Sequence, residues 1–206
     1  MDPTSLHAGK TEIRLNLGAS QTYLPGFVNV DISPLADIKL NLSTESLPFE
    51  TNSVSVVFSS HTLEHIPNYL FCLSEIYRVL VHGGKLFLGV PYVTLTEYNL
   101  VNPYHLHNFN EFSFDFFDPD LLKGSASEEN QIYFKKIFHR FHYMGKFATL
   151  PEPLRTWARR HLFNVVKEID FGLVAVKSAQ PLPHIEAQQM LQEYVSYCNA
   201  RVGYAR

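Results

Sequence analysis

The 206-residue chain has only two cysteines, Cys72 and Cys198, and they lie far apart in the sequence. This pair offers neither the close spacing of a zinc site nor the disulfide framework of a small secreted domain. The first five residues are polar and lack the apolar core of a signal peptide. We therefore expect a protein of the reducing cytoplasm.

Long apolar runs and an excess of charge of one sign are also missing. No apolar run approaches the roughly 18 residues that a membrane-spanning helix needs, so we expect no membrane partner. A formal net charge of -3 gives no support for a nucleic-acid groove, and no nucleic-acid partner is expected. With 46% hydrophobic and 18% charged residues, the composition is typical of a soluble globular protein.

Short apolar segments alternate with loops in the first half of the chain. Five strands are predicted, over residues 12–17, 27–32, 37–42, 53–59 and 84–90. Helical spacing over 68–81 predicts a helix, which Gly83-Gly84 should end. Strands linked in this way indicate a mostly parallel α/β sheet.

The connection from Gly18 to Asp31 is too short for an ordinary crossover helix, so we expect a reduced first helix that turns at Pro25-Gly26. Two later strands, over 131–143 and 169–177, with a helix over 153–165, would complete a seven-stranded, doubly wound, Rossmann-like sheet.

We expect one domain over 1–206. Its parts are an N-terminal tail at 1–11, an aromatic lid insertion at 92–125 and a C-terminal helix within 181–206. The apolar stripe of that helix includes Met190 and Tyr194, and it should pack on its own domain or on a second copy, which leaves a homodimer open.

The most informative stretch is Leu15–Ser20, followed by 25–31. An apolar strand enters a small-residue turn, and a second apolar strand ends on Asp31. Ligands of open α/β sheets bind at the carboxyl ends of the strands, where an acid can accept both hydroxyls of a ribose. The sequence therefore predicts a nucleoside cofactor.

Several blocks resemble the class I S-adenosylmethionine-dependent methyltransferases, and within them the type-11-like group that modifies sugars and other small molecules. The resembling blocks are Arg14–Gly18, Pro25–Asp31, Leu47–Phe49, Phe58–His65, Glu75–Leu80 and Gly83–Leu86. Their order and spacing carry the resemblance, which covers about half of the chain.

The resemblance implies S-adenosylmethionine as the cofactor and a set of residues that hold it. Gly18 would let the backbone approach the cofactor, Asp31 would bind its ribose, and Asn41 with Leu42 would lie near its adenine. The full expected set is Asn16, Gly18, Ala19, Ser20, Asp31, Asn41, Leu42, Ser60 and His61.

Histidines supply the candidate catalytic residues. His61 follows the fourth predicted strand, beside the expected reaction centre. Two roles are open for it: it is a base that assists methylation of a hydroxyl, or it caps the turn and contacts the cofactor. His105, in the lid, is the second candidate, and Tyr92, Tyr104, His105 and His107 are expected to bind the acceptor. The predicted function is methyl transfer to a hydroxyl or amine of a small molecule, with a sugar as the first candidate.

One departure from the family keeps an alternative open. Ser20 replaces the second glycine of the usual Gly-x-Gly turn, and its Cβ disfavours a positive φ. A catalytically weak or inactive protein, acting as a cofactor sensor or a partner-binding module, is the alternative.

Two further patterns favour other functions less well. His61-x-x-Glu64-His65 matches an inverted zinc-peptidase pattern, but it follows a buried strand and no third ligand is evident, so no metal is expected. A dehydrogenase would need a full G-x-G-x-x-G and about 20 residues before the ribose acid. Neither is present.

Overall fold

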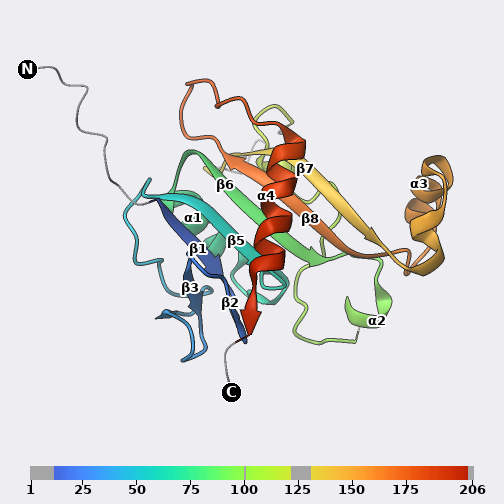
Figure 1. The fold of residues 1–206 in the computed structure, drawn as a ribbon, viewed down its shortest axis with the longest axis horizontal. Coiled ribbons are helices and arrows are strands. Elements are labelled where there is room, and N and C mark those ends of the chain that lie inside the picture. The colour runs from blue at the N-terminus through green and yellow to red at the C-terminus, as the bar shows by residue number, and fades with distance from the viewer. Residues whose placement is uncertain (1–11, 100, 122–130, 204–206) are drawn as a thin grey trace, which may run out of the picture.

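The computed structural model describes residues 12–99, 101–121 and 131–203, and it contains the predicted seven-stranded sheet (Figure 1). The strand order is β4-β3-β1-β5-β6-β8-β7. The strands are β1 (Ile13–Leu17), β3 (Val28–Asp31), β4 (Ile38–Lys39), β5 (Val54–Ser60), β6 (Leu80–Pro91), β7 (Phe134–Tyr143) and β8 (Val166–Ala175). All neighbours from β4 to β6 pair in parallel, whereas β8 is antiparallel to both β6 and β7. The predicted Rossmann-like α/β class is confirmed.

The first crossover helix is absent from the described chain between β1 and β3. Only β2 (Thr22–Tyr23) forms there, and it pairs antiparallel with β9 (Val202–Gly203) at the other end of the chain. Asn29 shapes the turn, because its side-chain oxygen accepts from the backbone N–H of Leu24 at 2.8 Å. The reduced first helix is therefore confirmed. The segment that replaces it is paired with β9, which follows α4 in the chain.

One face of the sheet is covered by α1 (Tyr69–Val79) and by the lid insertion. Buried residues of α1 share a hydrophobic core with Phe109, Phe114 and Phe117 of the insertion. The insertion also contains the short helices α2 (Thr96–Asn99) and η3 (Asp115–Phe117). Its phenylalanines therefore build the core of this face.

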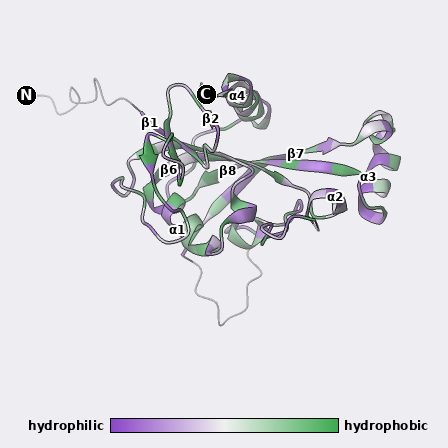
Figure 2. Cartoon of the chain, turned by 90° about the horizontal axis from the view of Figure 1, so that it is seen from below, coloured by the Kyte–Doolittle hydropathy of each residue, from purple (hydrophilic) through white to green (hydrophobic). Residues whose placement is uncertain are grey.

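The opposite face is covered by α4 (Ala187–Ala200), as Figure 2 shows. Met190 and Tyr194 of α4 are buried on a core that includes Phe58 and Phe87 of the sheet. Without a crossover helix between β1 and β3, this C-terminal helix is what shields that face from water. Its apolar stripe is thus used within the chain, and a homodimer through α4 stays a prediction.

Several element boundaries differ from the prediction. Gly83-Gly84 does not end the helix, because β6 already begins at Leu80 and contains both glycines. A Cβ on Gly84 would lie 2.9 Å from the backbone oxygen of Val81, so the irregular start of β6 requires glycine.

Helix α3 (Glu152–His161) is shorter than predicted. It ends four residues before residue 165, and β8 starts at Val166 rather than at 169. Asn164 between them has φ +57°, which the helix cannot accommodate. The short helix η4 (Gly145–Thr149) precedes α3, which lies at the far end of β7 and β8 (Figure 1).

Parts of the predicted divisions lie outside the described residues, namely the tail at 1–11, residues 100 and 122–125 of the lid, and residues 204–206 of the C-terminal segment. Among the residues that are described, no helix combines the length and apolar character needed to cross a membrane.

Candidate functional site

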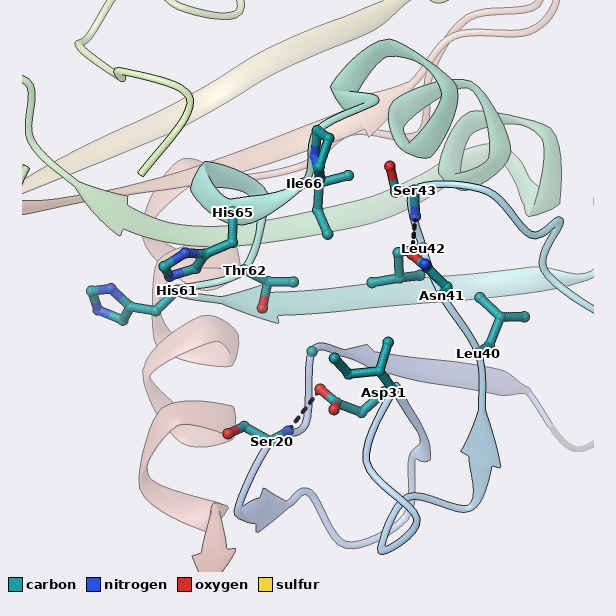
Figure 3. A pocket seen from close by; sticks show the side chains of 13 residues that line it. Ser20, Asp31, Leu40, Asn41, Leu42, Ser43, His61, Thr62, His65 and Ile66 are labelled. Carbon is teal, nitrogen blue, oxygen red and sulfur yellow. Dashed lines mark hydrogen bonds between the residues drawn. The ribbon is translucent and has the colours of Figure 1, made fainter. Parts of the chain in front are cut away.

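A cavity of about 440 Å³ lies where β1, β3 and β5 end (Figure 3). Parallel strands bring their carboxyl ends to this edge, which is where such sheets bind ligands. The cavity is lined by Gly18, Ser20, Asp31, Ile32, Leu40, Asn41, Leu42, Ser43, His61, Thr62, His65, Ile66 and Pro67. The main strand-end residues singled out in the sequence thus meet at one site.

The turn after β1 has positive φ angles at both Gly18 and Ser20, although the Cβ of Ser20 disfavours this conformation. Gly18 has φ +73°, and its N–H donates to the backbone oxygen of Val30 at 2.8 Å. A Cβ at Gly18 would lie 1.9 Å from Oγ1 of Thr62, so close packing within the protein alone requires glycine. Ser20 takes φ +51°, and its N–H donates to Oδ2 of Asp31 at 2.9 Å (Figure 3). The turn therefore forms with a serine in the second glycine position.

Asp31 is held firmly at the end of β3. Besides Ser20, the backbone N–H of Ser33 donates to its Oδ1 at 2.8 Å. A carboxylate has about four acceptor positions. These two hydrogen bonds fix its orientation and leave acceptor positions for a diol in the cavity.

The remaining predicted cofactor residues divide into two groups. Asn41 and Leu42 line the cavity, and Oδ1 of Asn41 accepts from the N–H of Ser43 at 2.9 Å. Three others do not line it: Asn16 is buried and donates to Asn29, Ala19 is buried, and Ser60 accepts from Arg201. Asn16 thus stabilises the turn through Asn29.

His61 lies between two carboxylates at the edge of the cavity. Its Nδ1 is 3.4 Å from Oε1 of Glu64, and its Nε2 is 3.2 Å from Oε2 of Glu168. The neighbouring carboxylates of Glu168 and Glu64 raise the pKa of His61 to about 9. His61 also has φ +52°, a strained backbone that is common at functional sites.

A second cavity of about 260 Å³ adjoins the first, and His61 and His65 line both. Its other lining residues are Glu64, Pro91, Leu95, Tyr98, His105 and Lys167. The insertion is joined to this region because Leu106 N–H donates to the backbone oxygen of Glu64 at 2.7 Å.

His105 is positioned by Asn99. The amide nitrogen of Asn99 donates to the backbone oxygen of Tyr92 at 2.7 Å, so its Oδ1 faces Nδ1 of His105, 3.1 Å away. Nδ1 must then carry the proton, and Nε2 keeps its lone pair. Burial is the main reason that the pKa of His105 is lowered.

The other predicted acceptor residues lie outside the second cavity. Tyr92 is buried and donates to Glu111, Tyr104 is 73% exposed, and a ring nitrogen of His107 contacts the backbone oxygen of Ile66. Sequence reasoning missed Thr62, because its role depends on contact with Gly18, and Glu168, because β8 brings it from more than 100 residues away.

Comparisons with known proteins agree with this fold. A family model described as a methyltransferase domain matches residues 23–88. Sterol 4-C-methyltransferase strm-1 of Caenorhabditis elegans is 28% identical over 102 residues, which are 50% of this chain and 30% of that protein. The chain therefore spans about a third of the length of that curated relative.

Solved structures share the architecture. A methyltransferase of Haloferax volcanii, in complex with a methyltransferase activator, has a TM-score of 0.53 and 13% identity, covering 82% of this chain and 84% of that one. A SAM-dependent methyltransferase of Archaeoglobus fulgidus has a TM-score of 0.51 and 15% identity, covering 79% and 86%. The domain match over residues 23–88 and the shared architecture make this chain similar to the S-adenosylmethionine-dependent methyltransferases.

Proposed function

We propose that the chain binds S-adenosylmethionine in the cavity beside Gly18 and Asp31 and methylates a small molecule held in the adjoining cavity. The observation that carries this proposal is the contact between the two cavities, which share His61 and His65. Methyl transfer needs the donor and the acceptor aligned and shielded from water. Two adjoining cavities meet that need.

The first cavity offers separate groups for each part of the cofactor. Asp31 would accept from the ribose hydroxyls, while Ile32, Leu40 and Leu42 give apolar walls for the adenine. Once bound, the cofactor supplies a methyl group on a positively charged sulfur. We place the methyl-bearing sulfur of the cofactor near His61, in the wall that the two cavities share.

The second cavity would take the acceptor. Its lining of histidine, glutamate, lysine and tyrosine side chains suits a hydroxyl-bearing molecule, for which a sugar remains our first candidate. Both ring nitrogens of His61 face carboxylates, so we do not assign it as the base. We assign it to orienting the cofactor and the acceptor where the two cavities meet. Nε2 of His105 has an available lone pair, and we assign His105 to the acceptor oxygen.

The alternative is a protein that binds the cofactor without turnover. Ser20 motivates it, although the Ser20–Asp31 hydrogen bond supports an intact binding turn. Incubation with methyl-labelled S-adenosylmethionine and a panel of nucleotide sugars, phenols and sterols separates the two. Sterols join the panel because of the sterol methyltransferase relative.

We expect at least one acceptor to gain label, with S-adenosylhomocysteine formed in equal amount. Cofactor binding with no labelled product across the panel and across cell extracts would favour the alternative. Absence of cofactor binding would contradict the proposed function itself.

A further inference from the structure

Three side chains converge on the second cavity: Glu64, His65 and His105. Each offers one ligand atom, and the three atoms lie within 4.8 Å of one another. Nε2 of His65 is 3.9 Å from Oε1 of Glu64, and the two imidazole rings meet edge to face with centroids 4.7 Å apart. In the sequence, the motif His61-x-x-Glu64-His65 had no evident third ligand beside its two histidines, whereas the fold places His105 of the insertion next to Glu64 and His65.

Hydrogen bonds at Nδ1 orient the imidazoles of His65 and His105, and in both residues Nε2 is left available to a ligand. Nδ1 of His65 is 3.0 Å from the backbone oxygen of Tyr104, which can only accept, so this nitrogen carries the proton. Nδ1 of His105 donates to Asn99, as described above. Both Nε2 atoms therefore keep their lone pairs. Metal-binding histidines show this arrangement, in which the second ring nitrogen donates to an oxygen.

Glu64 supplies an independent observation. Glu64 is 0% exposed, and neither oxygen of its carboxylate has a hydrogen-bond partner among the described residues. The nearest cationic group is Nδ1 of His61, at 3.4 Å. A buried carboxylate is costly unless it is paired with a cation or coordinates a metal. His61 pairs with Oε1, whereas Oε2 has no partner among the described residues, so a cation in the cavity that Glu64 lines would satisfy the second oxygen.

We propose that Glu64, His65 and His105 form a binding site for a divalent transition-metal cation in the wall of the acceptor cavity. Two imidazoles and one carboxylate are a donor set that suits zinc, iron or manganese better than magnesium, which prefers oxygen. Ligands about 2.1 Å from one ion lie roughly 3 to 4 Å apart, so binding would draw these atoms closer together. His65, with a partly exposed side chain, has room to move.

The site deepens the proposed function, on which its chemical role rests, because His105 would then reach the acceptor oxygen through the metal ion rather than by direct contact of Nε2. Three protein ligands leave a position for an oxygen of the acceptor. A hydroxyl bound there would lose its proton to water more readily. Its oxygen would then bond to the methyl carbon as the sulfur–carbon bond breaks, leaving a neutral thioether.

The test uses the purified, tag-free full chain after treatment with a chelator. Zinc is titrated by calorimetry, Co²⁺ is added as an absorbing probe, and Mg²⁺ serves as the comparison. We expect one zinc per chain and a Co²⁺ spectrum that zinc removes. His105→Ala and Glu64→Gln should each weaken zinc binding by more than about 10-fold. Asn99→Ala, which frees His105, should weaken it by roughly 10-fold.

His107→Ala is the matched control, because His107 lies in the same insertion but contacts Ile66 outside the cluster. It should leave zinc affinity unchanged. Thermal unfolding checks that each variant folds. No zinc binding by the folded wild-type chain, or equal zinc binding by wild type and His105→Ala, would overturn the site.

Titration with S-adenosylmethionine separates this inference from the proposed function. A chain that binds the cofactor but no zinc would contradict the metal site alone. A chain that binds zinc at these residues but no cofactor would contradict the proposed function and leave the metal site standing.

Discussion

At the residue scale, two of the four described non-glycine residues with positive φ line the cavity beside Gly18 and Asp31. Ser20 and His61, which both line it, have φ values of +51° and +52°. Side chains with a Cβ disfavour this region by roughly 1–2 kcal/mol, so surrounding contacts must stabilise it. For Ser20 the hydrogen bond from its N–H to Asp31 is such a contact.

Replacing Ser20 with glycine tests this strain directly. Ser20→Gly should stabilise the folded protein by up to about 1 kcal/mol, because glycine adopts a positive φ without a steric penalty. Chemical denaturation measures the change, and calorimetry should show cofactor affinity equal to wild type or tighter. Destabilisation together with weaker binding would mean that the serine hydroxyl contacts the cofactor.

Removal of the Asp31 carboxylate tests the ribose assignment. Asp31→Ala should weaken S-adenosylmethionine binding by more than about 10-fold, because two hydroxyls lose their acceptor. Ser33→Ala is a suitable control, since its N–H remains available to Asp31. Unchanged affinity in folded Asp31→Ala would remove Asp31 from the cofactor site.

At the element scale, α4 performs the shielding that a first crossover helix would otherwise provide. Met190 is 1% exposed against the sheet. Met190→Ala should therefore lower the free energy of unfolding by about 2–5 kcal/mol. Gln192→Ala, on the exposed side of the same helix, should change it by less than about 0.5 kcal/mol. Equal effects would show that α4 is not packed as described.

A second element, α1, is joined by Glu75 and Arg78 to the loop between β4 and β5. Glu75 accepts from Arg78 and from the N–H of Leu47, and the hydrogen bond from Arg78 lowers the pKa of Glu75. Its contribution to stability is therefore present above its unfolded pKa, near about 4.3, and is lost as the pH falls through the lower folded value.

Glu75→Gln should consequently destabilise the protein by about 1–3 kcal/mol at pH 7. The difference from wild type should start to shrink as the pH falls below the unfolded pKa of about 4.3. It should be lost once the pH is below the lowered folded pKa of Glu75, where the wild-type carboxylate is itself protonated. Denaturant unfolding at several pH values measures both effects. A difference that stayed constant with pH would exclude the charge of Glu75 as its cause.

At the scale of the whole molecule, the sequence predicted what depends on local order along the chain. The strand pattern, the short link from Gly18 to Asp31 and the turn itself follow from neighbouring residues. The shared cavity wall depends on contacts between distant segments. Glu168 reaches His61 from β8, and His105 reaches Glu64 from the insertion, so no spacing rule could reveal them.

The lid illustrates the same limit. Its aromatic residues predicted an acceptor wall, yet Phe109, Phe114 and Phe117 pack into the core beneath the sheet. Composition does not tell which face of an irregular segment turns inward, because such a segment lacks the fixed period of a helix or strand. Of the four acceptor residues named from the sequence, His105 alone lines the second cavity, where Tyr98 is a further lid residue.

Calorimetric titration of the purified chain with S-adenosylmethionine, and separately with S-adenosylhomocysteine, tests the central claim most directly. The account predicts one binding site per chain with a dissociation constant in the micromolar range, weakened by Asp31→Ala. Failure of the folded wild-type chain to bind either molecule would contradict the assignment of the Gly18–Asp31 cavity as a cofactor site.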